Sequence, residues 1–124
     1  MIYLSSKKFP NKHYSLQKDL LGNEFFKEQQ ISKNSNIKIQ YIGRPSFLGN
    51  PFSHLDETLA KYKCSSRNES ILKFEEYFYS LPEFSKPKIF CKSLKEFGTN
   101  LSLQCWCCPL DCHGRIILKY ISTL

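Results

Sequence analysis

The sequence predicts a small, single-domain α/β protein whose sheet is largely parallel and is flanked by helices. Residues 37–42 and 101–105 alternate apolar and polar side chains, which is typical of β-strands. Helical patterns lie between these two segments, and strands joined by helical crossovers usually run parallel. With 124 residues, 41% of them hydrophobic, the chain is long enough to bury one core.

Residues 1–36 are expected to form an N-terminal strand and a lysine-rich insertion that pack on a core of residues 37–124. The short apolar run Met1–Leu4 predicts a strand at the edge of the sheet. In the polar stretch that follows, Gly22-Asn23 interrupts an apolar patch whose spacing favours a helix. The patch consists of Leu16, Leu20, Leu21, Phe25 and Phe26.

A helix is predicted over Arg67–Tyr79, because Ser66 and Glu69 have the S-x-x-E spacing of a capping box. Pro82 is expected to end this helix. Its apolar face consists of Ile71, Phe74 and Phe78.

Two further helices are predicted in the C-terminal half. One follows Pro87, with Phe97 on its apolar stripe and Gly98 at its C-terminal end. Asp111 is expected to cap the last helix. That helix is expected to bury Ile116, Ile117, Tyr120 and Ile121.

The segment Cys105–Gly114 contains four of the six cysteines and one of the three histidines. Thiolates and imidazole are the ligands that zinc prefers. Cys105 and Cys107 lie on the same side of an extended segment, so with Cys112 and His113 they form the predicted tetrahedral set, with Cys108 as a substitute ligand or a bystander. The C-x-C-C-x3-C-H spacing is not that of a zinc finger, and burial as small apolar side chains explains the cysteines almost equally well.

The N-terminus has no long apolar segment of a secretory signal, which predicts a cytoplasmic protein with reduced thiols. No apolar run is long enough to span a bilayer, so no membrane partner is expected. The formal charge of +7 and the pI near 9.1 are compatible with a polyanionic partner such as a nucleotide or nucleic acid. The lysines are spread along the chain, so charge alone decides little.

A second motif, YIGRPSFLGNPF, occupies residues 41–52. Gly43 permits a close approach of the backbone to a ligand, Arg44 has a forked donor group suited to phosphate, and Asn50 offers a donor and an acceptor. A purely structural loop is an equally good interpretation. If the two strands are parallel, this loop and the cysteine loop leave the same edge of the sheet, where ligands bind in open α/β sheets.

Together the two motifs resemble a family of small domains of unknown function found in bacteria, bacteriophages, some eukaryotes and their viruses. The resemblance covers roughly residues 37–121 and implies a shared site, although the family supplies no activity. Cys108 falls at a variable position, and Arg115 stands where the family has an acidic residue. The shared residues are Tyr41, Gly43, Arg44, Pro45, Gly49, Asn50, Pro51, Phe52, Arg67, Cys105, Trp106, Cys107, Pro109, Cys112, His113 and Gly114.

The sequence favours a metal-stabilised module that binds an anionic ligand, either a nucleotide or a nucleic acid. Zinc is the expected metal, on the four ligands named above. Trp106 either stacks on a base or packs beside the cysteines. The predicted ligand-binding residues are Arg44, Asn50, Arg67 and Trp106.

Two other functions remain open. One is a small enzyme acting on a nucleotide or base, with Cys107 or Cys112 as a nucleophile activated by His113, or with a water activated by zinc. The deaminase signature and the glycine-rich phosphate-binding motifs are absent from the sequence. The other is a host-interaction protein without catalysis.

Overall fold

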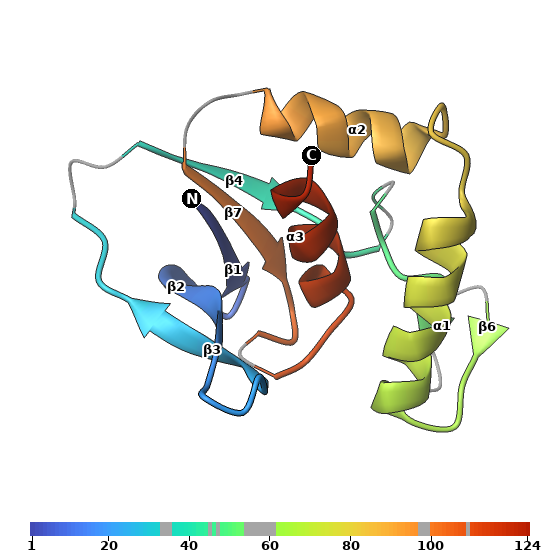
Figure 1. The fold of residues 1–124 in the computed structure, drawn as a ribbon, viewed down its shortest axis with the longest axis horizontal. Coiled ribbons are helices and arrows are strands. Elements are labelled where there is room, and N and C mark those ends of the chain that lie inside the picture. Colours follow the sequence, from blue (N-terminus) through green and yellow to red (C-terminus); the bar gives the residue numbers. More distant parts are fainter. Residues whose placement is uncertain (33–35, 45, 47, 54–61, 97–99, 109) are drawn as a thin grey trace.

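The computed structural model describes residues 1–32, 36–44, 46, 48–53, 62–96, 100–108 and 110–124. The described elements are β1 (Ile2–Ser6), β2 (Phe9–Lys18), β3 (Glu24–Gln29), β4 (Ile37–Tyr41), β5 (Phe52–Ser53), β6 (Tyr62–Lys63), α1 (Arg67–Ser80), α2 (Lys86–Lys95), β7 (Asn100–Cys105) and α3 (Gly114–Ser122). Five strands form one sheet in the order β3-β2-β1-β7-β4, and β5 pairs with β6 (Figure 1). The predicted α/β class is confirmed.

The sheet is mixed, so the prediction of a largely parallel sheet is wrong. β4 and β7 are parallel as predicted, and β1 is parallel to β7. However, β2 is antiparallel to both β1 and β3, because tight turns join these three strands where helical crossovers were expected. Met1–Leu4 was also predicted at the sheet edge, but β1 lies between β2 and β7.

The apolar patch predicted as a helix within residues 5–36 forms the β2–β3 hairpin instead. Asp19 Oδ1 accepts hydrogen bonds from two backbone N–H groups of the turn, each 2.9 Å long. Gly22 has φ of 84°, a left-handed conformation that favours glycine. Leu20 and Leu21 project from this turn into solvent, so their helical spacing did not reflect a buried helical face.

α1 begins with half of the predicted capping box. The Ser66 hydroxyl accepts from the N–H of Glu69 at 3.1 Å. The Glu69 carboxylate accepts a hydrogen bond from the N–H of Ser65 at 3.2 Å, whereas a capping box would use the N–H of Ser66. The predicted apolar face of α1 is buried in the core.

α2 has Pro87 in its first turn, as predicted, while Phe97 and Gly98 lie outside the described residues. The predicted cap of the last helix is wrong, because His113 occupies the N-cap position of α3 and makes no side-chain capping bond. Asp111 instead accepts a hydrogen bond from Arg115 Nε at 2.9 Å. All four residues predicted to be buried by this helix are buried.

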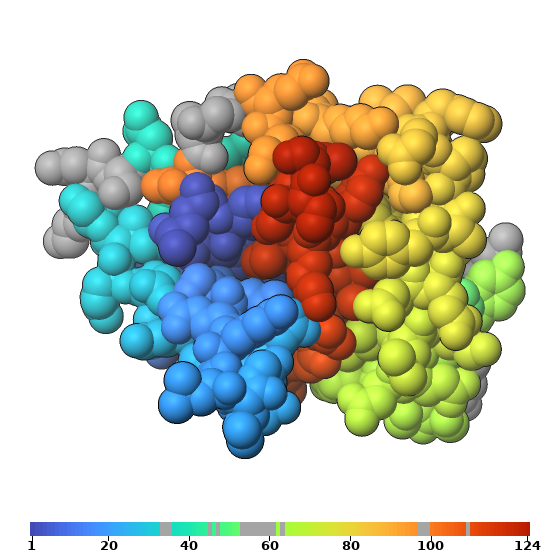
Figure 2. Space-filling model, in the orientation of Figure 1, coloured from blue at the N-terminus to red at the C-terminus, as the bar shows by residue number. Residues whose placement is uncertain are grey.

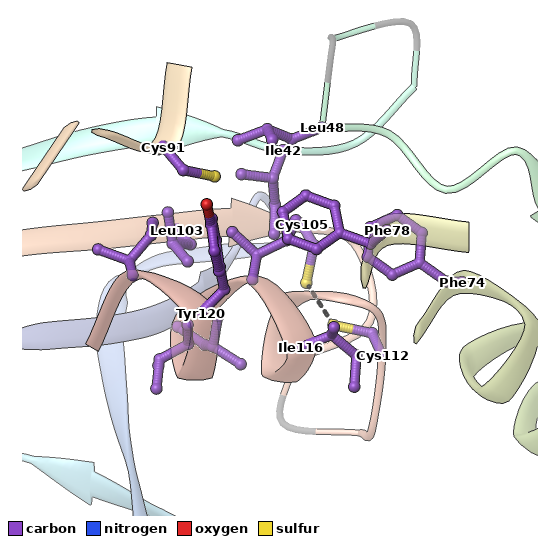
Figure 3. Packing of buried hydrophobic residues seen from close by; sticks show 14 of the residues in the cluster. Ile42, Leu48, Phe74, Phe78, Cys91, Leu103, Cys105, Cys112, Ile116 and Tyr120 are labelled. Carbon is purple, nitrogen blue, oxygen red and sulfur yellow. Dashed lines mark hydrogen bonds between the residues drawn. The ribbon is translucent and has the colours of Figure 1, made fainter. Parts of the chain in front are cut away.

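α3 covers one face of the sheet over β1 and β7, and α2 packs against α3 (Figure 1). On the molecular surface α3 lies between the N-terminal strands and α1 (Figure 2). The hydrophobic core fills the space beneath α3 and extends to α1 (Figure 3). Cys105 and Cys112 belong to this core, so the cysteine motif is continuous with the interior.

The opposite face of the central strands is polar. His13 Nδ1 lies 2.8 Å from the Ser102 hydroxyl, which donates to the Ser5 hydroxyl at 2.9 Å. All three side chains are buried. Because buried polar groups are costly unless they are paired, this network stabilises the alignment of β1, β2 and β7.

Candidate functional site

The two motif loops meet at one edge of the sheet, as the parallel pairing of β4 and β7 predicts. β4 continues into residues 42–52, and β7 continues into residues 106–113. His113 Nε2 lies 2.7 Å from the Ile42 carbonyl oxygen and connects the two loops. We call this region the loop-edge site. It consists of the described residues of 42–52 and 106–113, together with Arg67 at the start of α1.

Tyr41 makes a second connection between the loops. Its hydroxyl accepts from Trp106 Nε1 at 3.2 Å and donates to the Arg44 carbonyl oxygen at 3.0 Å. The phenol ring lies against Gly43, where a Cβ atom would overlap it. Gly43 is therefore needed for the close approach of Tyr41, and its predicted role near a ligand stays a prediction.

Arg44 is anchored by one end of its guanidinium group. Nη1 donates to the carbonyl oxygens of Asn50 (2.7 Å) and Phe52 (3.4 Å). The Asn50 amide donates to the Ser70 hydroxyl at 2.9 Å, and its oxygen accepts from the N–H of Phe52 at 2.9 Å. Asn50 is buried and ties its loop to α1, so its predicted contact with a ligand stays a prediction.

Arg67 brings a second guanidinium group to the same place, although it comes from the first residue of α1. Its Nη1 donates to the Asp111 carbonyl oxygen at 3.5 Å. Arg67 also lowers the pKa of the Cys107 thiol. Arg44 lies close enough to add its charge to the field at Cys107. Two of the three arginines of the chain therefore act on one sulfur.

The three cysteines predicted as ligands are neighbours. The sulfur atoms of Cys105 and Cys112 are 3.4 Å apart, and both side chains are buried (Figure 3). Cys107 is partly exposed and packs against the hydrophobic core. Cys108 is buried, and its burial raises the pKa of its thiol to about 12.

Cys107 has the most acidic environment for a thiol in this group. Cys112, Arg67 and Arg44, in that order, lower the pKa of the Cys107 thiol to about 6. The pKa of the Cys105 thiol is also lowered, first by its hydrogen bond with Cys112. The pKa of the Cys112 thiol is raised, first by Cys105 and then by Cys107.

His113 is turned away from the sulfurs. Its Nε2 donates to the Ile42 carbonyl oxygen, and its ring packs edge-on against Phe74 with 5.1 Å between ring centroids. Burial lowers the pKa of His113 to about 4, so the ring is neutral at neutral pH. This geometry does not place His113 as a base for Cys107 or as a fourth ligand beside the sulfurs.

The residues described do not assemble a complete zinc site. Within the described ranges, no group of three or more His, Cys, Asp or Glu side chains is arranged to hold a metal ion. The sulfurs of Cys105 and Cys112 lie 3.4 Å apart, but the His113 Nε2 donates to the Ile42 carbonyl oxygen. The predicted zinc ion stays a prediction.

The rings of Tyr41 and Trp106 form an aromatic platform beside the loop-edge site, and the ammonium group of Lys7 lies over both rings. The Lys7 ammonium lies 4.1 Å from the Tyr41 ring centroid and 5.6 Å from that of Trp106. Trp106 is 53% exposed and is not the buried wedge that the sequence also allowed. Sequence reasoning missed Lys7, because only the pairing of β1 with β7 brings residue 7 to this edge.

A family model for a domain of unknown function, DUF4326, matches residues 19–123. The chain belongs to this family. The predicted resemblance to a domain of unknown function is thereby confirmed, and the matched range includes every residue of the DUF4326 loop-edge site. No curated protein and no solved structure matches the chain. Among the described helices of this DUF4326 domain, none has the length and apolar character needed to cross a bilayer.

Proposed function

We propose that this DUF4326 domain binds an anionic ligand at the loop-edge site, with Arg44 and Arg67 as the main binding groups. The observation that carries the proposal is that backbone carbonyl oxygens hold both guanidinium groups, while both arginines lower the pKa of the partly exposed Cys107 thiol. Within the described residues, neither forms an ion pair with a carboxylate, whereas Arg115 pairs with Asp111 and Glu24. Guanidinium groups held by backbone carbonyls keep their charge available to a phosphate or carboxylate.

A nucleotide or a single-stranded nucleic acid is the ligand class that best fits the surroundings. The exposed face of Trp106 offers a stacking surface, while its N–H is already held by Tyr41. Lys7 adds a positive charge over both rings, and the chain carries a formal charge of +7. Phosphate would bind the arginines, and a base would stack on the aromatic platform.

A thermal-shift screen can test this proposal with inorganic phosphate, nucleoside mono- and diphosphates, and short single-stranded oligonucleotides. A ligand held by the native state raises the melting temperature. Trp106→Ala should weaken nucleotide binding about tenfold or more and leave phosphate binding unchanged, because stacking contributes about 1–3 kcal/mol per base. No shift with any of these anions would contradict the proposal.

The charge of Cys107 gives a second, sharper test. A thiolate between the arginines repels an incoming anion, so Cys107→Ser should bind phosphate more tightly than the wild type at pH 7.5. Cys108→Ser is the matched control, because its neighbouring thiol is neutral at this pH. Weaker phosphate binding by Cys107→Ser than by the control would show that the anion does not occupy the space beside this sulfur.

The zinc part of the hypothesis is supported by the contact between the sulfurs of Cys105 and Cys112, which are 3.4 Å apart. Cys107 in the same loop is the third proposed soft ligand, and a fourth ligand must come from elsewhere. Elemental analysis of protein purified without a histidine tag measures the metal directly. One zinc per chain, with loss of melting temperature on chelation, would support it; no metal would reject it.

The enzyme hypothesis is the second candidate, and the acidic thiol of Cys107 favours it. A partly exposed sulfur with pKa of about 6 is mostly thiolate at neutral pH and is a competent nucleophile. Here Arg67 and Cys112 activate it, in place of the His113 base expected from the sequence. Incubation of the nucleotides that shift the melting temperature, followed by product analysis, distinguishes turnover from binding alone.

A further inference from the structure

Beyond anion binding, we propose that the domain forms a symmetric dimer in which the β4 strands of two copies pair antiparallel. β4 is the last strand on one side of the five-stranded sheet, and β3 is the last strand on the other side (Figure 1). The edge of a sheet presents a row of backbone N–H and C=O groups with which another strand can pair. The occupant that fits the β4 edge is a second copy of the same strand.

The two edges of the sheet differ in how well they are protected against pairing. In β3, three of the six residues are charged, namely Glu24, Lys27 and Glu28. Native proteins use charged side chains on edge strands to prevent association. In β4, Lys38 is the one charged residue of five, and the side chain of the central residue, Ile39, is 47% exposed. β4 is therefore the edge at which a further strand can be added.

The backbone groups of every second residue of β4 point away from β7. Tyr41 lies opposite Gln104 in the parallel pairing, and the Ile42 N–H donates to the Gln104 carbonyl oxygen at 2.8 Å. In such a pair the residues on either side of Tyr41 bond to β7, so the N–H and C=O of Tyr41 itself face the open edge. The same holds for the residues two and four positions before it. The Tyr41 carbonyl oxygen accepts a hydrogen bond from the side chain of Gln40 at 3.0 Å, a bond that a second strand would replace.

An antiparallel pairing centred on Ile39 uses the whole of β4. Ile39 then lies opposite Ile39 of the second copy, and Ile37 lies opposite Tyr41 of the second copy. The residues of each pair exchange two backbone hydrogen bonds, and their apolar side chains lie on one face of the sheet. On the other face, Lys38 lies opposite Gln40. A register centred on Lys38 would instead place two like charges directly opposite each other, which is destabilising.

This register also fixes the arrangement of the two loop-edge sites. The two-fold axis passes between the paired copies of Ile39 and is perpendicular to the sheet, so both Tyr41 rings lie on the same face of one continuous sheet. The two Tyr41 residues are offset by four positions, or about 14 Å along the strands. Because Tyr41 holds Trp106 by a hydrogen bond of 3.2 Å, the dimer has an aromatic platform at each end of the paired strands.

Sedimentation velocity of this 124-residue chain, with reductant present so that no disulfide forms, tests the proposal. The mass of the wild type should rise with protein concentration from 14.6 kDa towards twice that value. The dissociation constant should fall as salt is added, because each copy has a formal charge of +7 and salt screens the repulsion. A wild type that stays at 14.6 kDa up to about 200 μM would overturn the proposal.

Two variants with the same change in charge locate the interface. Ile39→Lys should raise the dissociation constant of the dimer about tenfold or more, because it places two positive charges opposite each other at the centre of the pairing. Phe25→Lys is the matched control, since Phe25 is an exposed apolar residue of the other edge strand. The control should associate like the wild type. Equal weakening in both variants, or none in Ile39→Lys, would contradict pairing through β4.

A cross-link tests the register and does not depend on the folding of Ile39→Lys. In the Ile39→Cys variant, mild oxidation should join two copies through residue 39. The Cα atoms of a hydrogen-bonded antiparallel pair are about 5.5 Å apart, within the range that a disulfide spans. Phe25→Cys should give no disulfide between two copies of residue 25. Peptide mapping identifies the linked residues. A dimer without a disulfide between the two copies of residue 39 would reject the register.

Discussion

The rate of alkylation of Cys107 by iodoacetamide should rise with a midpoint near pH 6, well below the pH of about 9 at which an unperturbed cysteine ionises. With a pKa of about 6 the sulfur is about 90% thiolate at pH 7, whereas with a pKa of 9 it is about 1% thiolate. The rate at pH 7 should therefore lie close to its plateau. The groups that face this sulfur and cause the shift are Cys112, Arg67 and Arg44, in that order.

The assay records intact mass against time from pH 4.5 to 9.5, with peptide mapping to identify the modified cysteine. Cys112→Ala should raise the midpoint most, because Cys112 contributes most to the lowered pKa of Cys107. Arg67→Gln should raise it by about one unit or more, since it removes both a donor and a charge. A wild-type midpoint above about pH 8 would refute the electrostatic account of the site.

Three other changes test the surroundings of the site. His113 has its pKa lowered to about 4 from 6.5, so its contribution to stability is complete above pH 6.5 and is lost as pH falls towards 4. The free energy of unfolding of the wild type should therefore fall by about 1.4 kcal/mol per pH unit in this window because of His113, and His113→Gln should lack that part of the slope. Gly43→Ala should cost about 1–3 kcal/mol in the free energy of unfolding, because its Cβ displaces the Tyr41 ring; an unchanged value would contradict the packing described. Asn50→Ala should cost about 1–3 kcal/mol, because it leaves Ser70 and the Phe52 N–H without their buried partner, while the exposed control Asn68→Ala should change little.

The features that could be predicted from the sequence depend on short-range rules. The Ser66 cap and the apolar face of α1 follow from spacing within one helix. The meeting of the two motif loops follows from a single statement, that β4 and β7 are parallel. That statement needed only two strand patterns separated by helices.

The mixed topology could not be read in the same way. In β2 and β3 most side chains are polar or partly exposed, so the hairpin has little of the alternation that identifies a strand. Exposed Leu20 and Leu21 in the turn added an apolar signal that had no structural meaning. The central position of β1 depends on this hairpin, because without it the N-terminal strand would lie at an edge.

The two sequence motifs locate the candidate site, but they do not predict the direction in which each side chain points. His113 follows Cys112 directly, yet it faces the Ile42 carbonyl because α3 begins at the next residue. Arg67 reaches Cys107 only through the packing of α1 beside the cysteine loop. Contacts of this kind join residues about 40 to 70 positions apart, where no sequence rule sets the geometry.

Isothermal titration of an anion into four proteins tests the central claim most directly. The proteins are the wild type, Arg44→Lys, Arg67→Lys and the control Arg115→Lys, which changes the arginine that pairs with carboxylates. With the nucleotide that gives the largest thermal shift, the first two variants should bind about tenfold more weakly, because lysine keeps the charge but loses the forked donor. Arg115→Lys should bind like the wild type. Equal affinity in all four proteins, or no binding to the wild type, would contradict an anion site at this edge of the domain.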